Sequence, residues 1–170
     1  NCLLGIKLPI FSHTKNANLK QELTFSILFD VLYGKSSDNY QQLLQEALIN
    51  ESFGTDITLE KSYSYIMIGS NSDHPELLFK AVRKIISDSF TTKLNEVDFI
   101  RTKKQLLGGF INALNSMEYI ANQFTKYHFQ NTSLFDLLNI TKEITLDDVE
   151  RCKQYLLDPH CYSEFTVYPK

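Results

Sequence analysis

The stretch Arg101–Tyr127, RTKKQLLGGFINALNSMEYIANQFTKY, carries the most specific pattern in this chain. Apolar residues recur at helical spacing on both sides of Asn115–Ser116, which predicts two helices joined at that point. The predicted apolar face consists of Leu107, Phe110, Ile111 and Leu114 before the joint and of Ile120, Ala121 and Phe124 after it. A glycine pair, Gly108–Gly109, lies within the first helix, where it favours a kink or close helix packing.

A regular series of strand and helix signals precedes this stretch. We expect a strand at Cys2–Leu8, a polar loop at Phe11–Leu19, helices at about Gln21–Tyr33 and Asn39–Ile49, a hairpin of Thr55–Leu59 and Ser62–Gly69, and a helix from Asp73–Pro75 to Phe90. Gly34 suits the end of the first helix, and Ser36–Ser37 provide caps for the second.

After the stretch, Thr145–Asp148 is a near capping box that predicts a helix over Val149 and Leu156. A final strand is expected at Cys161–Tyr168. The order is therefore strand, two helices, hairpin, three or four helices, strand. It predicts an α+β fold with an antiparallel sheet of about four to six strands and helices packed on one face.

No linker, repeat or low-complexity segment divides the chain, so residues 1–170 are expected to form a single domain. Because the sequence begins at Asn1 and opens directly in a strand, we expect it to be a fragment of a longer protein with two halves.

The composition is that of an ordinary globular protein, with 43% hydrophobic and 22% charged residues. The formal net charge is -3 without a basic block, which argues against nucleic-acid binding. Cys2, Cys152 and Cys161 are an odd number without C-x-x-C spacing, as expected of free thiols in a reducing compartment such as the cytoplasm. No apolar run is long enough to span a membrane, and no secretory signal opens the sequence.

Zinc hydrolysis commonly uses His-Glu-x-x-His or its inverse, His-x-x-Glu-His. The four histidines, His13, His74, His128 and His160, have no second histidine within five positions, so neither motif is present. Cys152, His160 and Cys161 could share a metal, although packing roles for the cysteines are favoured.

Three further patterns partly resemble a phosphate-binding loop, a nucleophile elbow and a general acid–base pair. Gly34-Lys35-Ser36 imitates the end of a phosphate-binding loop, but Phe29 stands where the first glycine should be. Gly69–Ser72 lacks the closing glycine of a nucleophile elbow. Glu118–Tyr119 with Tyr127–His128 leaves a general acid–base role open, although capping and packing already explain those residues. We therefore predict no catalytic, cofactor-binding or metal-binding residue in this chain.

The segments in order are LGIKLP, LTFSILFDVLYGKSS, DNYQQLLQEALI, DITLEKSYSYIMIGSNSD, PELLFKAVRKIISDSF, the long arm NEVDFIRTKKQLLGGFINALNSMEYIANQFTKY, and TLDDVERCKQYL. This series resembles the C-terminal-type domain of the insulinase-like (pitrilysin) zinc metallopeptidases. It is most similar to their bacterial cytoplasmic branch, whose members carry Leu-Asn-Ser-x-Glu-x-Ile-Ala-Asn-Gln-Phe in the long arm, here Leu114 to Phe124.

The resemblance implies a protein of repeated α+β domains, whose two halves enclose a chamber. Zinc is bound by His-x-x-Glu-His in the first domain, and domains of the present type close the chamber and help to hold an extended peptide. The implied function is thus a non-catalytic, substrate-holding domain of a zinc-dependent peptidase, inactive alone and without a cofactor of its own. Its implied partner is the N-terminal half of the same chain or a homologous subunit, with no nucleic acid or membrane. The alternative is a scaffold or interaction domain in a protein that has lost peptidase activity.

The chain departs from the family pattern after the second helix. Many active relatives carry an arginine and a tyrosine there, which polarise the scissile carbonyl. The matching segment, Leu44–Phe53, has no arginine, and Phe53 is nearest to the tyrosine position. A phenyl ring cannot donate that hydrogen bond, so no functional residue is carried over. Restoring a tyrosine at position 53 is not expected to create activity.

Overall fold

The computed structural model describes residues 1–11, 16–130 and 132–168. Its elements are β1 (Cys2–Lys7), α1 (Ala17–Tyr33), α2 (Asp38–Gln45), β2 (Gly54–Leu59), β3 (Ser64–Ser70), α3 (Pro75–Asp88), α4 (Glu96–Ala113), α5 (Met117–Phe129), α6 (Asp136–Glu143), α7 (Leu146–Cys152) and β4 (Tyr162–Thr166). Short 3-10 turns at Lys153–Leu156 and Pro159–Cys161 connect α7 to β4. In the described part of the chain no helix is long and apolar enough to cross a membrane.

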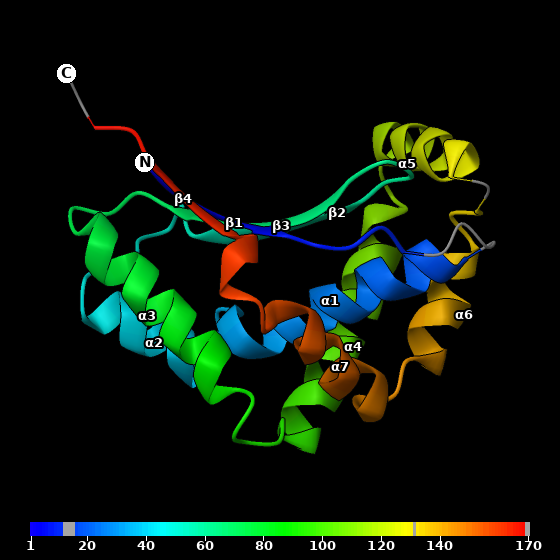
Figure 1. Ribbon diagram of the computed structural model, residues 1–170. Helices are drawn as coiled ribbons and strands as arrows, with labels where there is room; N and C mark the ends of the chain where they lie inside the picture. Colours follow the sequence, from blue (N-terminus) through cyan, green and yellow to red (C-terminus); the bar gives the residue numbers. More distant parts are fainter. Residues whose placement is uncertain (12–15, 131, 169–170) are drawn as a thin grey trace.

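The four strands form one antiparallel sheet in the order β2-β3-β1-β4. Side chains alternate across it, because Leu4, Ile6 and Ile66 are buried toward the helices whereas Leu3 and Met67 lie on the opposite face and are half-buried. Figure 1 shows the sheet edge-on with the helices gathered below it. Helix α5 is the exception, because it lies beyond the turn between β2 and β3. The predicted α+β fold with a one-sided helical layer is confirmed.

Helix α1 is the centre of the domain. Four nearly consecutive residues of this helix are fully buried: Phe25, Ile27, Leu28 and Phe29. Because they point to different sides of the helix, α1 must have packing partners all around it. The sheet covers one side through β2, and α2, α4, α6 and α7 contact the others. A helix surrounded in this way fixes the positions of the elements that pack on it.

Four helices begin at capping side chains, and two of these caps confirm the helix starts predicted at Ser36–Ser37 and Thr145. The side chains of Ser37, Asn95, Ser116 and Thr145 accept hydrogen bonds from backbone N–H groups in the first turns of α2, α4, α5 and α7. Thr145 and Asp148 complete a reciprocal capping box. The joint predicted at Asn115–Ser116 separates α4 from α5.

Two boundaries differ from the prediction. Helix α1 begins at Ala17, inside the expected loop at Phe11–Leu19, of which residues 12–15 lie outside the described part. The Asn16 side chain does not cap this helix, because its amide donates to Asp136 and accepts from the Thr132 hydroxyl. Helix α2 ends at Gln45 rather than Ile49, since Ala47 adopts a left-handed conformation with φ of 54°. The spacing of Leu43, Leu44 and Leu48 predicts a shared buried stripe, which is wrong at Leu44 because this residue is exposed.

Helix α6 raises the number of α-helices between the hairpin and β4 to five, where three or four were expected. It has only eight residues, and Phe135 at its N-cap position provides no side-chain hydrogen bond. A short helix without a capping residue has no start signal in the sequence. Its apolar residues Leu137 and Ile140 are nevertheless buried.

The apolar face predicted for the long arm is only partly correct. Phe110 is buried, but Ile111 is 58% and Phe124 is 51% exposed. In α5 the buried residue is Tyr127, and the half-buried Ile120 packs beside it against the core. The expectation of close packing at Gly108–Gly109 is wrong, because a Cβ at either position would meet nothing within 4 Å in the described structure.

We therefore expect the double substitution G108A/G109A to stabilise the isolated domain. Each glycine in a helix interior costs about 1 kcal/mol relative to alanine, and the open space around both positions accepts a methyl group, so the gain should be about 1 to 2 kcal/mol. Urea unfolding followed by circular dichroism measures it. G69A is the contrasting control, because its Cβ would meet the Leu3 side chain at 2.7 Å, and it should give no such gain. Unchanged or lower stability of the double variant would contradict the open environment.

Asp148 links α7 to α1 and should make stability depend on acid. Partial burial raises the pKa of its carboxyl, but hydrogen bonds from Thr145, Arg151 and Lys20 outweigh burial and lower this pKa to about 2, from an ordinary value of 3.8. A lowered pKa in the folded state stabilises the fold above about pH 4, and this contribution is lost as the pH falls toward about 2.

D148N should therefore lower the free energy of unfolding by about 1 kcal/mol near neutral pH, after allowance for solvent screening, and by less at about pH 3. Urea titrations at the two pH values measure the difference. D147N, which alters an exposed carboxyl in the same helical turn, is the matched control. An effect of D148N that stays constant with pH would show that the carboxylate charge is not what stabilises the cap.

Candidate functional site

In the described part of the chain the helices leave one face of the sheet uncovered (Figure 1). Apolar side chains lie along this face. Leu3 and Met67 are half-buried on this face, and Phe165, opposite Leu3 in the β1–β4 register, is 62% exposed. Tyr63 and Tyr65 continue the surface with stacked rings whose centroids are 6.0 Å apart. Aromatic and apolar groups on an open sheet can contact the side chains of a bound polypeptide.

A shallow hollow of about 330 Å³ lies on the same face, where β2 begins and β3 ends. Its lining consists of Asn1, Leu3, Ser52, Gly54, Thr55, Asp56, Met67, Gly69 and Ser70. Two of these residues are glycines, and a Cβ at Gly69 would press against the Leu3 side chain. The Leu3 side chain therefore covers Gly69, whereas no described atom lies within 4 Å of a Cβ placed on Gly54, so another backbone could approach β2 closely at that end of the hollow.

Strand β2 is an edge of the sheet, because only β3 pairs with it among the described strands. Alternate backbone N–H and C=O groups of an edge strand point outward and can pair with an added strand. Asp56 on β2 lies beside Met67 on the uncovered face. The edge and the hollow together could hold an extended peptide through backbone hydrogen bonds and side-chain contacts.

The segment Leu44–Phe53, where active relatives carry arginine and tyrosine, leads to this hollow. Ser52 lines the hollow, and its hydroxyl donates to Asn50 and accepts from the Asn71 backbone N–H at 2.8 Å, which ties the segment to the end of β3. Phe53 instead points into the core, where its ring contacts Tyr33 and Tyr40 with centroids 6.1 and 5.8 Å away. The segment thus supplies a hydroxyl to the hollow but no electrophilic side chain.

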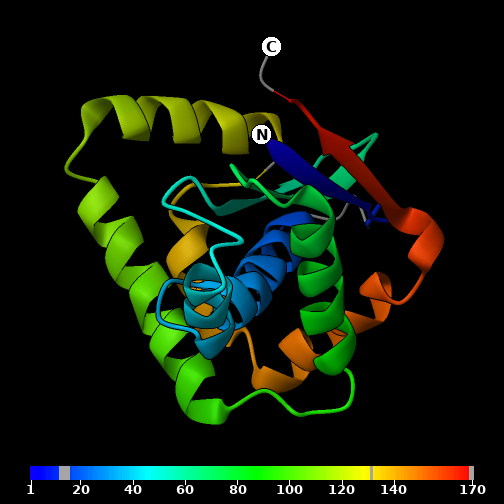
Figure 2. The ribbon, with the colours of Figure 1, turned by 90° about the vertical axis from the view of Figure 1, so that its left-hand side faces the viewer.

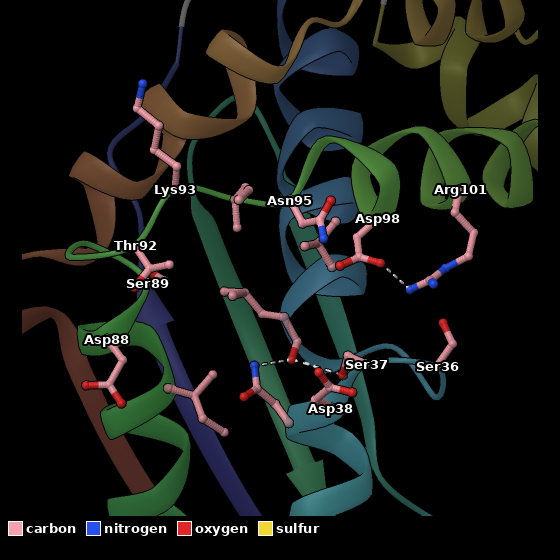
Figure 3. Close-up of a pocket in the computed structure, with 15 residues that line it drawn as sticks. Ser36, Ser37, Asp38, Asp88, Ser89, Thr92, Lys93, Asn95, Asp98 and Arg101 are labelled. Atoms are coloured by element: carbon pink, nitrogen blue, oxygen red, sulfur yellow. Dashed lines mark hydrogen bonds and ion pairs between the residues drawn. The ribbon is translucent and has the colours of Figure 1, made fainter.

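A second hollow, of about 370 Å³, lies where the ends of α1 and α3 meet the starts of α2 and α4 (Figure 3). Asp38, Asp88 and Asp98 face it together with Lys93 and Arg101, and the Asp98 carboxylate binds the Arg101 guanidinium at 2.8 Å. The Ser37 hydroxyl and the Asn39 amide both donate to the Leu32 carbonyl. Mixed charge and internally paired groups indicate a polar junction between helices rather than a binding site.

Among the described residues, the thiol and imidazole groups do not converge on a metal site. Cys152 is buried on α7 and accepts a hydrogen bond from the Gln21 amide at 3.0 Å, and burial raises the pKa of its thiol to about 12. Such a thiol stays protonated and is a poor metal ligand. His160 and Cys161 lie in the 3-10 turn before β4. Within the described ranges no group of three His, Cys, Asp or Glu side chains is arranged to hold a metal ion.

The described histidines lie at separate places in the fold. His74 precedes α3, His128 stacks on Phe124 on the exposed side of α5, and His13 lies outside the described residues.

The residues Glu118–Tyr119 and Tyr127–His128, weighed above for a general acid–base role, lie on different sides of α5. Tyr127 is buried, whereas Glu118 and His128 are exposed on other sides of the helix. Near Tyr127, the Lys126 ammonium binds the Glu22 carboxylate of α1 at 3.1 Å, and burial raises the pKa of Glu22 despite this partner. Sequence reasoning did not single out Glu22, because this residue lies within an ordinary helical pattern. These groups attach α5 to the domain, and their geometry does not form a general acid–base pair.

Comparisons with known proteins agree with this architecture. The sequence matches no protein-family model. It is 36% identical over 172 residues to an uncharacterized zinc protease of Bacillus subtilis, YmfH, covering 99% of this chain and 39% of that protein. The fold matches a crystal structure named an M16-like peptidase from Alicyclobacillus acidocaldarius, with a TM-score of 0.86, 23% identity, and coverage of 96% and 39% of the two chains. The chain is similar over nearly its whole length to one domain of the insulinase-like, or M16-like, proteins.

A second solved structure has nearly the same length as this insulinase-like domain. It is named the inactive peptidase domain of a zinc protease from Bordetella parapertussis, and it matches with a TM-score of 0.75 and 13% identity over 100% of this chain and 91% of that one. The present chain spans about two-fifths of YmfH and of the Alicyclobacillus protein. In both relatives more than half of the polypeptide therefore lies outside the matched region.

Proposed function

We propose that this insulinase-like domain is a non-catalytic part of a larger zinc peptidase and holds an extended peptide on its uncovered sheet face. The zinc site would lie on another domain, in an N-terminal half of the same chain or in a homologous subunit, and the two halves would enclose the chamber. The cytoplasm is the proposed compartment, since three free cysteines suit a reducing environment.

The observation that carries the proposal is the hollow beside the edge strand β2. It combines an open backbone at Gly54 with an apolar floor at Leu3 and Met67. An extended chain beside β2 would gain backbone hydrogen bonds at the edge and place alternate side chains over the apolar floor. Binding of this kind depends on the peptide backbone more than on the peptide's sequence. A chamber wall that accepts varied substrates requires such binding.

Peptide binding by M67E tests this role. Fluorescence anisotropy with labelled, extended peptides should show weaker binding by about tenfold, equivalent to about 1.4 kcal/mol, because the charge enters the apolar floor. L77E is the matched control, since Leu77 is exposed on α3, in the helical layer. Equal binding by both variants, or no binding by the wild type, would reject the role and favour a scaffold domain.

Metal analysis gives a second expected outcome. The purified 170-residue chain should contain zinc far below one atom per molecule and should not cleave casein, because its described residues offer no three-ligand group. Inductively coupled plasma mass spectrometry measures the zinc, with a classical His-x-x-Glu-His peptidase as the positive control. Tight stoichiometric zinc would contradict the assignment of the metal to another domain.

A further inference from the structure

The apolar face of helix α5 is only partly covered within the described structure. Ile120 and Tyr127 form the edge of this face that packs on the domain. Met117, Ala121 and Phe124, at positions i, i+4 and i+7, form the neighbouring edge of the same face, here called the outer stripe. Met117 is 85% exposed and Phe124 is 51% exposed. The described domain therefore leaves about half of one wide apolar face of α5 uncovered.

The inward attachment of α5 is slight. Tyr127 is the single buried residue in its 13 positions. Among the described residues, the half-buried Tyr119 and Ile120 also pack against the core. The polar ties are the Lys126–Glu22 ion pair and a hydrogen bond from the Gln130 amide to the Glu60 carboxylate at 3.2 Å, next to the β2–β3 turn. Figure 2 shows α5 running along the margin of the molecule and meeting α4 at a corner. A helix held by so few buried groups is in the low-stability part of a fold unless something else covers it.

The outer side of α4 near this corner is also apolar and exposed in the described structure. Gly108 and Ile111 are three positions apart and share a helical face, and Ile111 is 58% exposed. No described atom lies within 4 Å of a Cβ placed on Gly108 or Gly109. The glycines therefore have no packing role inside the domain, and they would let another backbone approach α4 closely.

We propose that the outer stripe of α5 and the Gly108–Ile111 side of α4 dock against an apolar surface of another domain in the same polypeptide. This inference rests on the proposed function, in which the chain belongs to a longer protein. The relatives YmfH and the Alicyclobacillus protein extend well beyond the matched 39%, so their polypeptides contain room for such a domain.

The size of the patch favours a partner in the same chain over a separate one. A stable complex of two proteins buries about 800 Å² on each partner, which is more than a few side chains provide. A domain joined through the same chain has a high effective concentration and needs less buried area. The docking surface also lies away from Met67 and the hollow, on different elements, so it can be tested separately from peptide binding.

Site-specific cross-linking in the complete polypeptide tests the docking. A benzophenone amino acid at position 124 should form an intramolecular cross-link to a segment outside residues 1–170, identified by mass spectrometry of the tryptic peptides. The same probe at Leu77, which is 55% exposed on α3, is the control and should not give that product. Cross-links from position 124 to a second copy or to an added peptide, or no cross-link, would overturn the proposal.

Hydrogen exchange provides an independent measurement. The amides of α5 should exchange about tenfold or more slowly in the complete polypeptide than in the 170-residue chain, and F124D should remove most of this difference. Equal exchange of α5 in both forms would overturn the docking. Protection of α5 together with unaltered peptide binding by M67E would reject the peptide-holding role and retain the docking, so the two failures are distinguishable.

Discussion

Replacing Lys153 by methionine is expected to lower the free energy of unfolding by about 3 kcal/mol. Its ammonium group is buried, donates to the Ser89 carbonyl at 2.7 Å and the Thr92 carbonyl at 3.3 Å, and binds the Glu150 carboxylate at 2.6 Å. Methionine fills the space of the stem but leaves the carbonyls and the carboxylate without their donor, and breaking a buried ion pair costs about 3 to 5 kcal/mol.

Urea unfolding measures this loss, and K84M is the matched control because Lys84 is exposed on α3. It should change stability by no more than about 0.5 kcal/mol. The double variant E150Q/K153M should lose less than the sum of the two single variants, since glutamine removes the charge left unpaired. A K153M variant as stable as K84M would mean that water replaces the lost donor.

The Lys153 network matters because it holds the connection between α3 and α4. Glu150 also accepts a hydrogen bond from the Leu94 backbone N–H at 2.6 Å, directly before the α4 cap at Asn95. Both ends of the connection are thereby tied to α7 and its following turn. The direction in which α4 leaves the domain depends on this contact, and so does the place of the α4–α5 corner.

Phe53→Ala should cost a similar amount, about 3 kcal/mol, through a cavity in the core. The Phe53 ring is 9% exposed and packs against Tyr33 and Tyr40. Loss of the ring should also loosen the neighbouring Ser52, which lines the hollow, so peptide binding should weaken along with stability. Thermal unfolding and fluorescence anisotropy measure the two effects.

Phe53→Tyr is the informative companion, because it preserves the ring and adds a hydroxyl that the core must accommodate. We expect a loss of about 1 kcal/mol and no peptidase activity, since the side chain points away from the hollow and no arginine lies in Leu44–Phe53. If F53A were as stable as F53Y, the ring would contribute little to the core. Peptide cleavage by F53Y would contradict the packing role assigned to this position.

The sequence predicted the strands and most helix starts because these depend on neighbouring residues. Caps such as Ser37 and Thr145 bind within their own helix, and strand alternation at Ile66 and Ile68 follows from the sheet itself. The start of α1 was missed because Asn16 binds Asp136, which is distant in sequence.

The candidate site was predictable only in part. The lack of a zinc motif follows from histidine spacing, but the hollow combines β2, β3, Ser52 and the chain start, which only the register brings together. The inward face of α5 could not be deduced either, since Met117, Ala121 and Phe124 have the same helical period as a buried stripe. Which edge of this apolar face is buried is decided by tertiary contacts such as Glu22–Lys126.

The uncovered sheet face has a practical consequence for handling this domain. An antiparallel sheet with one bare apolar side and the edge strands β2 and β4 resembles half of a two-sheet sandwich, and two such halves attract each other in water. Purified alone, the domain is expected to associate reversibly as its concentration rises, through Phe165 and its neighbours. Light scattering would then report a mass that grows with concentration, and solubility would improve when a charged side chain is introduced on that face.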